Sequence, residues 1–208
     1  YKRQGNKRAC SFGDISTTSF FPAKPLGCYG DGGAVFTDND EWTALVDSYR
    51  VHGKGMFKYD NVRIGMNSRL DTLQAAILKI KFKAFREYEL RDINKAAALY
   101  TKLLAGRVKT PVTPEGYYSS WAQYTICLNS REERDALQAC LKEQGIPSMV
   151  YYPTPMHGQT AYKALNAPTD CCPMAKRLCD TVLSLPVHPY ITEEEIETVC
   201  SVILGFVR

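Results

Sequence analysis

The chain has 208 residues, of which 45% are hydrophobic and 23% charged, the composition of an ordinary soluble globular protein. Its 26 basic and 22 acidic residues leave a net charge of +4 that is spread along the chain, so neither nucleic acid nor a membrane surface is expected as a partner. No apolar stretch is long enough to span a bilayer, and the polar start, 1–8, is not a secretory signal.

The first half predicts two strands, a helix and a loop. Residues 14–21 and 33–37 are rich in β-branched and aromatic types, which favours strands. Asn39 is expected to cap a helix over 40–50. Residues 51–67 contain several glycines and no helical period, which predicts a long loop, and long ordered loops in compact folds are usually functional.

A long helix is expected next. Residues 68–71 predict a capping box. The apolar stripe that follows continues without Gly or Pro to about Leu104, shortly before Gly106. A helix of this length suggests an element that bridges two domains or lies against a partner subunit.

The second half predicts shorter elements of both types. Strands are expected over 121–128, 148–152 and 182–185. Helices are expected to begin at Ser130, Pro173 and Thr192, with a loop and one short helix from 155.

These elements predict an α/β fold that divides near residue 105. Residues 1–105 would be the C-terminal part of a large α/β domain, including the long helix. Residues 106–208 would be a small C-terminal α+β domain with helices packed on an antiparallel sheet. Because two strands cannot form a self-sufficient sheet and no Met begins the chain, we expect a C-terminal fragment of a longer protein.

The eight cysteines are expected to be reduced. Several lie inside apolar patterns, as Cys200 does, where cysteine behaves as a small hydrophobic residue. A chain of this length can build a core without disulfides, which favours reduced thiols and a cytoplasmic location. A metal site at Cys171, Cys172, Cys179 and His188 would lack the paired CxxC spacing of zinc modules, so no metal is expected.

Lys24 is the candidate for covalent chemistry. It ends the apolar run 19–24, and glycines follow over 27–33, where the backbone must turn tightly. A partly desolvated lysine is an available amine nucleophile, as a Schiff base with an aldehyde cofactor such as pyridoxal phosphate (PLP) requires. Taken alone, the pattern is more typical of a surface lysine beside a turn.

Two other groupings could bind an anion. Ser19, at the end of a predicted strand, could bind a phosphate oxygen, or it could be a strand serine exposed to water. Asn67 lies where a helix is expected to begin, and a helix N-terminus attracts anions, although Ser68 could merely cap that helix. His157 and His188 lie in proline-bounded loops, where binding residues concentrate, and for His188 a hydrogen-bonded loop histidine is favoured.

Together these segments resemble the DegT/StrS-type sugar aminotransferases, which have the type I PLP-dependent transferase (aspartate aminotransferase-like) fold. The resemblance runs over nearly the whole chain. Five blocks carry it: the lysine segment 11–24, the glycine turn 30–35, residues 50–53, residues 65–76, and the landmarks 152–157 and 185–189.

The resemblance implies a role for each site residue. Lys24 would form the Schiff base with PLP and shuttle the proton, and Ser19 would bind the cofactor phosphate. Asn67 would reach the phosphate of the neighbouring subunit's cofactor, so a homodimer would share its active sites. His52 and His157 would lie near the sugar-nucleotide entrance. The implied reaction moves an amino group from an amino acid, glutamate in this family, to a keto-sugar nucleotide.

The sequence departs from the family in one respect. Three cofactor contacts that the family places before the lysine are not found here, namely a residue over the pyridine ring, an acidic residue on its nitrogen, and a glutamine or histidine nearby. We therefore expect an aminotransferase in the full-length parent, while the fragment alone would bind PLP poorly or not at all. The sugar, the ring position and the nucleotide are not specified by the sequence.

Other interpretations remain at this point. A dehydratase branch of the same family uses histidine in place of the lysine, and Lys24 argues against it. A non-catalytic dimerising or sensory remnant of an aminotransferase is the main alternative. A cysteine nucleophile with a histidine base has no recognisable local signature in the sequence.

Overall fold

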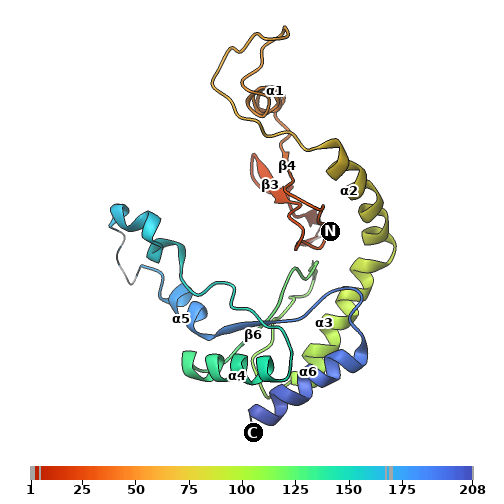
Figure 1. The fold of residues 1–208 in the computed structure, drawn as a ribbon, viewed down its shortest axis with the longest axis vertical. Coiled ribbons are helices and arrows are strands. Elements are labelled where there is room, and N and C mark those ends of the chain that lie inside the picture. The colour runs from red at the N-terminus through yellow and green to blue at the C-terminus, as the bar shows by residue number, and fades with distance from the viewer. Residues whose placement is uncertain (1–2, 5, 167, 169–170, 208) are drawn as a thin grey trace. The chain divides into compact units, whose positions relative to one another are not determined.

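The computed structural model describes residues 3–4, 6–166, 168 and 171–207 (Figure 1). The chain divides into two compact units. Unit 1 is Tyr1–Glu89 with Thr113–Ser120, and unit 2 is Leu90–Val112 with Trp121–Arg208. The division at residue 105 stays a prediction about the domains of the whole protein.

Unit 1 contains two small sheets and one capped helix. Strands β3 (Ser16–Ser19) and β4 (Gly33–Phe36) pair antiparallel, and β1 (Arg3–Gln4), β2 (Lys7–Arg8) and β5 (Tyr117–Tyr118) form a sheet of order β2-β1-β5. Helix α1 (Asp40–Tyr49) begins after Asn39, whose Oδ1 accepts the N–H of Trp42 at 3.0 Å. The two predicted strands and the Asn39 cap are therefore confirmed.

The predicted long helix is confirmed over Thr72 to Leu104. It consists of α2 (Thr72–Ala84), the π-helical turn η1 (Phe85–Glu89) and α3 (Leu90–Leu104). Its start was predicted wrongly, because the N-cap residue is Asp71 and Ser68 instead donates its N–H to the carbonyl of Arg50 at 2.9 Å. Residues 68–71 thus belong to the end of the preceding loop.

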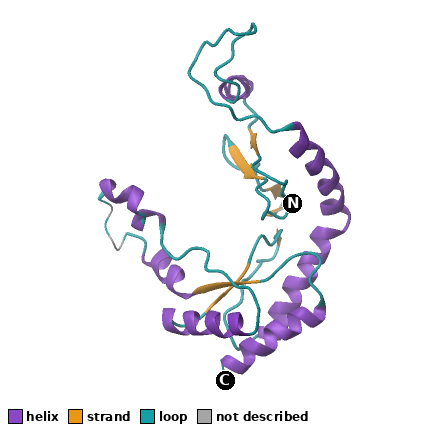
Figure 2. Cartoon of the chain, viewed as in Figure 1, coloured by secondary structure: helices purple, strands orange, loops and turns teal. Residues whose placement is uncertain are grey.

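Unit 2 packs helices on a two-stranded sheet (Figure 2). Strands β6 (Tyr124–Cys127) and β7 (Val182–Leu185) pair antiparallel. The helices are α3, α4 (Arg131–Glu143), α5 (Pro173–Thr181) and α6 (Glu193–Phe206), and two short 3₁₀ helices, η2 (Met156–Gly158) and η3 (Thr160–Leu165), precede α5. The strand predicted over 148–152 is reduced to a bridge between Met149 and Ser184, because prolines on both sides cannot donate to a ladder.

The core of unit 2 holds aromatic and aliphatic side chains of α3, α4, α6 and the sheet. The rings of Tyr100 and Tyr124 stack with centroids 5.0 Å apart, and the hydroxyl of Tyr100 donates to the carbonyl of Pro186 at 2.9 Å. Burial raises the pKa of the Cys200 thiol to about 11, so this cysteine stays protonated and acts as a core residue. No helix in the described part of the chain has both the length and the apolar composition that crossing a bilayer requires.

Candidate functional site

Lys24 lies in a turn that follows β3 in unit 1. Its backbone N–H donates to the carbonyl of Phe21 at 2.8 Å, and the residue is exposed. Gly27 closes the turn, because a Cβ at this position would lie 2.7 Å from the carbonyl oxygens of both Phe21 and Pro22. Only glycine allows so close an approach of two backbone segments, so the turn fixes the backbone from which Lys24 projects.

The buried thiol of Cys28 holds the end of this turn. Its N–H donates to the carbonyl of Phe20 at 2.8 Å, and its Sγ lies 3.0 Å from the carbonyl oxygens of Phe20 and Gly30. The loop between β3 and β4 is therefore fixed by hydrogen bonds within its own segment. Lys24 lies at the exposed tip of a constrained turn, so the described residues of this chain do not provide the partial desolvation considered from the sequence.

Ser19 is the last residue of β3 and is exposed. Its Oγ accepts the N–H of Phe21 at 3.2 Å, which leaves the hydroxyl hydrogen to donate to another group. Ser19 and Lys24 are thus presented by one strand-and-turn segment, as the sequence spacing predicts. Their roles toward a cofactor stay predictions.

His52 and Asn67 are brought together at the base of the loop 51–67. Val51 pairs with Asn67 in an antiparallel bridge, and His52 donates its N–H to the carbonyl of Met66 at 2.9 Å. Both His52 and Asn67 are exposed. The loop is therefore closed at its base, and its two predicted site residues lie on adjoining backbone segments.

Two glycines allow this closure. Gly53 has φ +76°, and a Cβ there would lie 1.8 Å from the carbonyl oxygen of Arg63. A Cβ on Gly65 would lie 2.1 Å from the N of Gly53. The backbone strands of the loop base thus pack directly on each other, which no side chain at either position would allow.

Gln74 is a structural contact that the sequence reasoning missed. Its Oε1 accepts the N–H of Tyr29 at 2.7 Å, which joins α2 to the loop that carries Lys24. The residue lies within the block 65–76, but nothing in its spacing identifies a partner 45 positions away.

A cavity of about 1190 Å³ lies in unit 1. It is lined by β3, β4, α1 and residues 66–70, and it includes Asn67 together with Arg50 and Arg69. Ser19, Lys24 and His52 are not among its lining residues. The lining also contains Asp14, Asp31, Asp38 and Asp47, and Asp47 pairs with Arg50, so the cavity is of mixed charge. It places Asn67 beside two arginines without joining it to the lysine turn within the described residues.

The histidines of unit 2 differ in their surroundings. His157 is half-buried on η2. His188 Nδ1 accepts the N–H of Tyr190 at 3.2 Å, so the hydrogen-bonded loop histidine favoured from sequence is confirmed.

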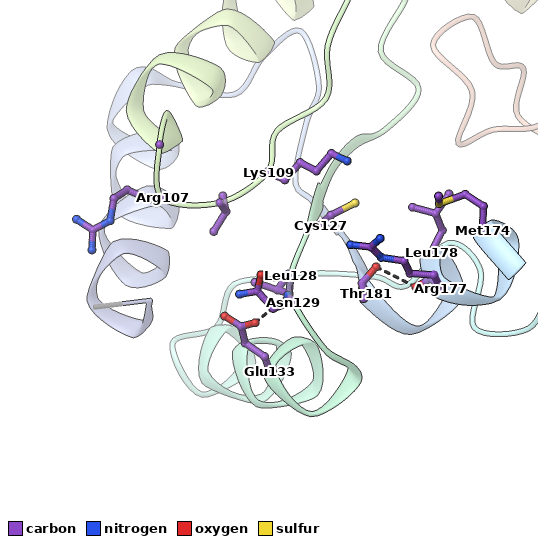
Figure 3. A pocket seen from close by; sticks show the side chains of 12 residues that line it. Arg107, Lys109, Cys127, Leu128, Asn129, Glu133, Met174, Arg177, Leu178 and Thr181 are labelled. Carbon is purple, nitrogen blue, oxygen red and sulfur yellow. Dashed lines mark hydrogen bonds between the residues drawn. The ribbon is translucent and has the colours of Figure 1, made fainter.

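A second cavity, of about 330 Å³, lies in unit 2 (Figure 3). The side chains of Lys109, Cys127 and Arg177 line it. Glu133, which also lines it, accepts the N–H of Asn129 at 2.8 Å. None of the predicted site residues lines this cavity. This cavity therefore does not include the site predicted from the sequence.

The chain matches known proteins along nearly its whole length. Residues 1–204 match the DegT/DnrJ/EryC1/StrS aminotransferase family, and the chain belongs to this family. A solved DegT DnrJ EryC1 StrS aminotransferase from Brucella abortus superimposes with a TM-score of 0.92 at 45% identity, covering 99% of this chain and 54% of that one. The fold is accordingly part of the type I PLP-dependent transferase fold, as predicted.

Two curated relatives show the range of names in the family. The chain is 41% identical to a UDP-2-acetamido-2-deoxy-3-oxo-D-glucuronate aminotransferase of Pseudomonas aeruginosa, over 94% of this chain and 52% of the relative. It is 42% identical to a pleiotropic regulatory protein of Geobacillus stearothermophilus, again over 94% and 52%. The chain spans about half the length of the curated relatives it matches.

Proposed function

We propose that the whole protein is a PLP-dependent aminotransferase that moves an amino group from glutamate to a keto-sugar nucleotide, with Lys24 as the residue that forms the Schiff base. The observation that carries the proposal is the exposed amine of Lys24 on a turn that only glycine can close, in a chain of an aminotransferase family. The aminotransferase relative in Pseudomonas acts on a UDP-linked 3-oxo sugar, as its name states, which supports the substrate class.

The residues of the lysine segment fit PLP. The cofactor supplies an aldehyde for condensation with amines and a ring that withdraws electrons from the reacting bond. Lys24 Nζ would condense with that aldehyde and release one water, and Ser19 would donate its hydroxyl hydrogen to a phosphate oxygen. When the donor amine displaces Lys24, the neutral Lys24 amine would take the proton from the donor's α-carbon.

We also propose a cytoplasmic homodimer that shares its active sites, with Asn67 directed at the partner's cofactor phosphate and His52 and His157 near the sugar-nucleotide entrance. The loop that ends in Asn67 supports the dimer, because it exposes an unusual number of large apolar side chains. They are Met56, Phe57, Tyr59, Val62, Ile64 and Met66. All eight cysteines, which lie in the described part of the chain, are thiols and none forms a disulfide, which supports the cytoplasmic location.

Ile64→Glu should weaken this dimer. Ile64 is 96% exposed, and burying such a side chain at an interface contributes about 1.5–3 kcal/mol, so the dimer dissociation constant should rise about tenfold or more. Sedimentation of the full-length protein over a dilution series measures this constant. Val112→Glu, at an apolar position of unit 2 that is 83% exposed, is the matched control and should leave it unchanged. Equal effects of the two substitutions would count against an interface at the loop.

Absorbance and borohydride trapping test the function directly. The full-length protein with PLP should show a visible band that bleaches when glutamate is added, and reduction with borohydride should fix the label on the peptide that contains Lys24. A protein kept only for binding or regulation would give no response to glutamate. A label on any other peptide would remove Lys24 from its role.

A further inference from the structure

Three side chains that can bind a metal ion meet in unit 2. The ligand atoms of His157, Cys171 and Cys172 all lie within 4.8 Å of one another. The sequence spacing groups the two cysteines with Cys179 and His188 and predicts no metal. In the structure Cys179 is buried on α5, and the histidine that joins the two other cysteines is His157 instead of His188.

The size of this group suits a single ion. Three atoms with no separation above 4.8 Å all lie within about 2.8 Å of a common point, which is 4.8 Å divided by the square root of three. Zinc binds thiolate sulfur at about 2.3 Å and imidazole nitrogen at about 2.0–2.1 Å. An ion at that point would need each ligand atom to move by at most about 0.5–0.8 Å, which small side-chain rotations supply.

Secondary structure anchors the backbone on both sides of the group. His157 lies on η2, where Gly158 donates its N–H to the carbonyl of Pro155 at 2.9 Å. Cys172 is the residue before the first turn of α5, and its carbonyl accepts the N–H of Lys176 at 3.1 Å. The backbone is thus held locally at His157 and at Cys172, and the three ligand atoms already lie together, so side-chain adjustment is enough to bind an ion.

The donor set and its exposure identify the class of ion. Two thiolates and one imidazole select a borderline-soft ion such as Zn²⁺ over Mg²⁺ or Ca²⁺, which prefer oxygen ligands. Cys171 and Cys172 are exposed and His157 is half-buried, so an ion can enter from solvent. We propose that His157, Cys171 and Cys172 bind one Zn²⁺, whose fourth position is left to water or a solute. This site shares His157 with the proposed sugar-nucleotide entrance, but metal binding to it does not require aminotransferase activity.

Cobalt substitution tests the site. Untagged full-length protein, stripped of metal and kept reduced, is titrated with Co²⁺ as the probe, and difference spectra against cobalt-free protein report thiolate-to-cobalt charge transfer. We expect one such site per chain, with Zn²⁺ displacing the cobalt. Cys171→Ser and Cys172→Ser should each weaken cobalt binding about tenfold or more, because even outer-shell changes at metal sites cost 10–100-fold.

Cys140→Ser is the matched control. Cys140 is a half-buried thiol on α4 of the same unit and lies outside the group. Its substitution should leave the charge-transfer band and the cobalt affinity unchanged. The proposal is overturned if the wild-type protein shows no thiolate–cobalt band, or if the band persists at full affinity in both Cys171→Ser and Cys172→Ser.

Discussion

Lys24→Ala should reduce transamination by the full-length protein by at least about a thousandfold. The substitution removes both the amine that condenses with the cofactor aldehyde and the base that moves the proton, and a positioned base alone contributes about 10²–10⁴-fold. Lys24 is exposed at the tip of its turn, and that turn is held by backbone groups and by Cys28. Loss of the Lys24 side chain should therefore leave the fold intact and reduce only the rate of transamination. Steady-state turnover of glutamate and a keto-sugar nucleotide measures it.

Two further variants test whether the reaction needs the amine nucleophile of Lys24 or only its positive charge. Lys24→Arg keeps a cation at the position but cannot form the Schiff base, so it should be as inactive as Lys24→Ala. Lys142→Ala removes an exposed lysine on α4 of unit 2 and should leave turnover unchanged. Turnover retained in Lys24→Arg would show that the positive charge, and not the nucleophile, is what the reaction needs.

The elements with a strong local signal could be predicted from sequence. Asn39 and the periodic apolar stripe to Leu104 define α1 and the long helical segment because capping and helical packing are local properties. The start of that segment was misplaced at 68–71, since the backbone of Ser68 bonds to Arg50 across the loop. No local pattern reports a bond to a residue 18 positions earlier in the chain.

The site was predictable only in part for the same reason. Ser19 and Lys24 share one segment, so their spacing in the sequence carries over to the structure. The placement of His52 beside Asn67 depends on the bridge between Val51 and Asn67, and Gln74 contacts the backbone of Tyr29. Both contacts depend on how the loops close, which the sequence does not display. The same holds for the group of His157 with Cys171 and Cys172, because the two cysteines follow the histidine by 14 and 15 positions.

Gly53→Ala should destabilise unit 1 more than any other single methyl addition at a described glycine. Gly53 has φ +76°, and its new Cβ would lie 1.8 Å from the carbonyl oxygen of Arg63, a backbone atom that no rotamer change can move. Gly116 has φ +78° in the same unit, and a methyl group added there would have nothing within 4 Å. The pair therefore shares the backbone strain and differs only in the steric clash.

Gly116→Ala should cost about 1 kcal/mol, the usual penalty for a side chain in the left-handed region. Gly53→Ala should cost at least about 3 kcal/mol more, because the loop base must open to relieve the clash. Denaturant unfolding of the full-length protein measures both free energies. Since His52 and Asn67 lie at that base, Gly53→Ala should also weaken the proposed dimer, which Gly116→Ala should not. Equal destabilisation by the two substitutions would mean that the loop base adjusts freely and does not hold these two residues in place.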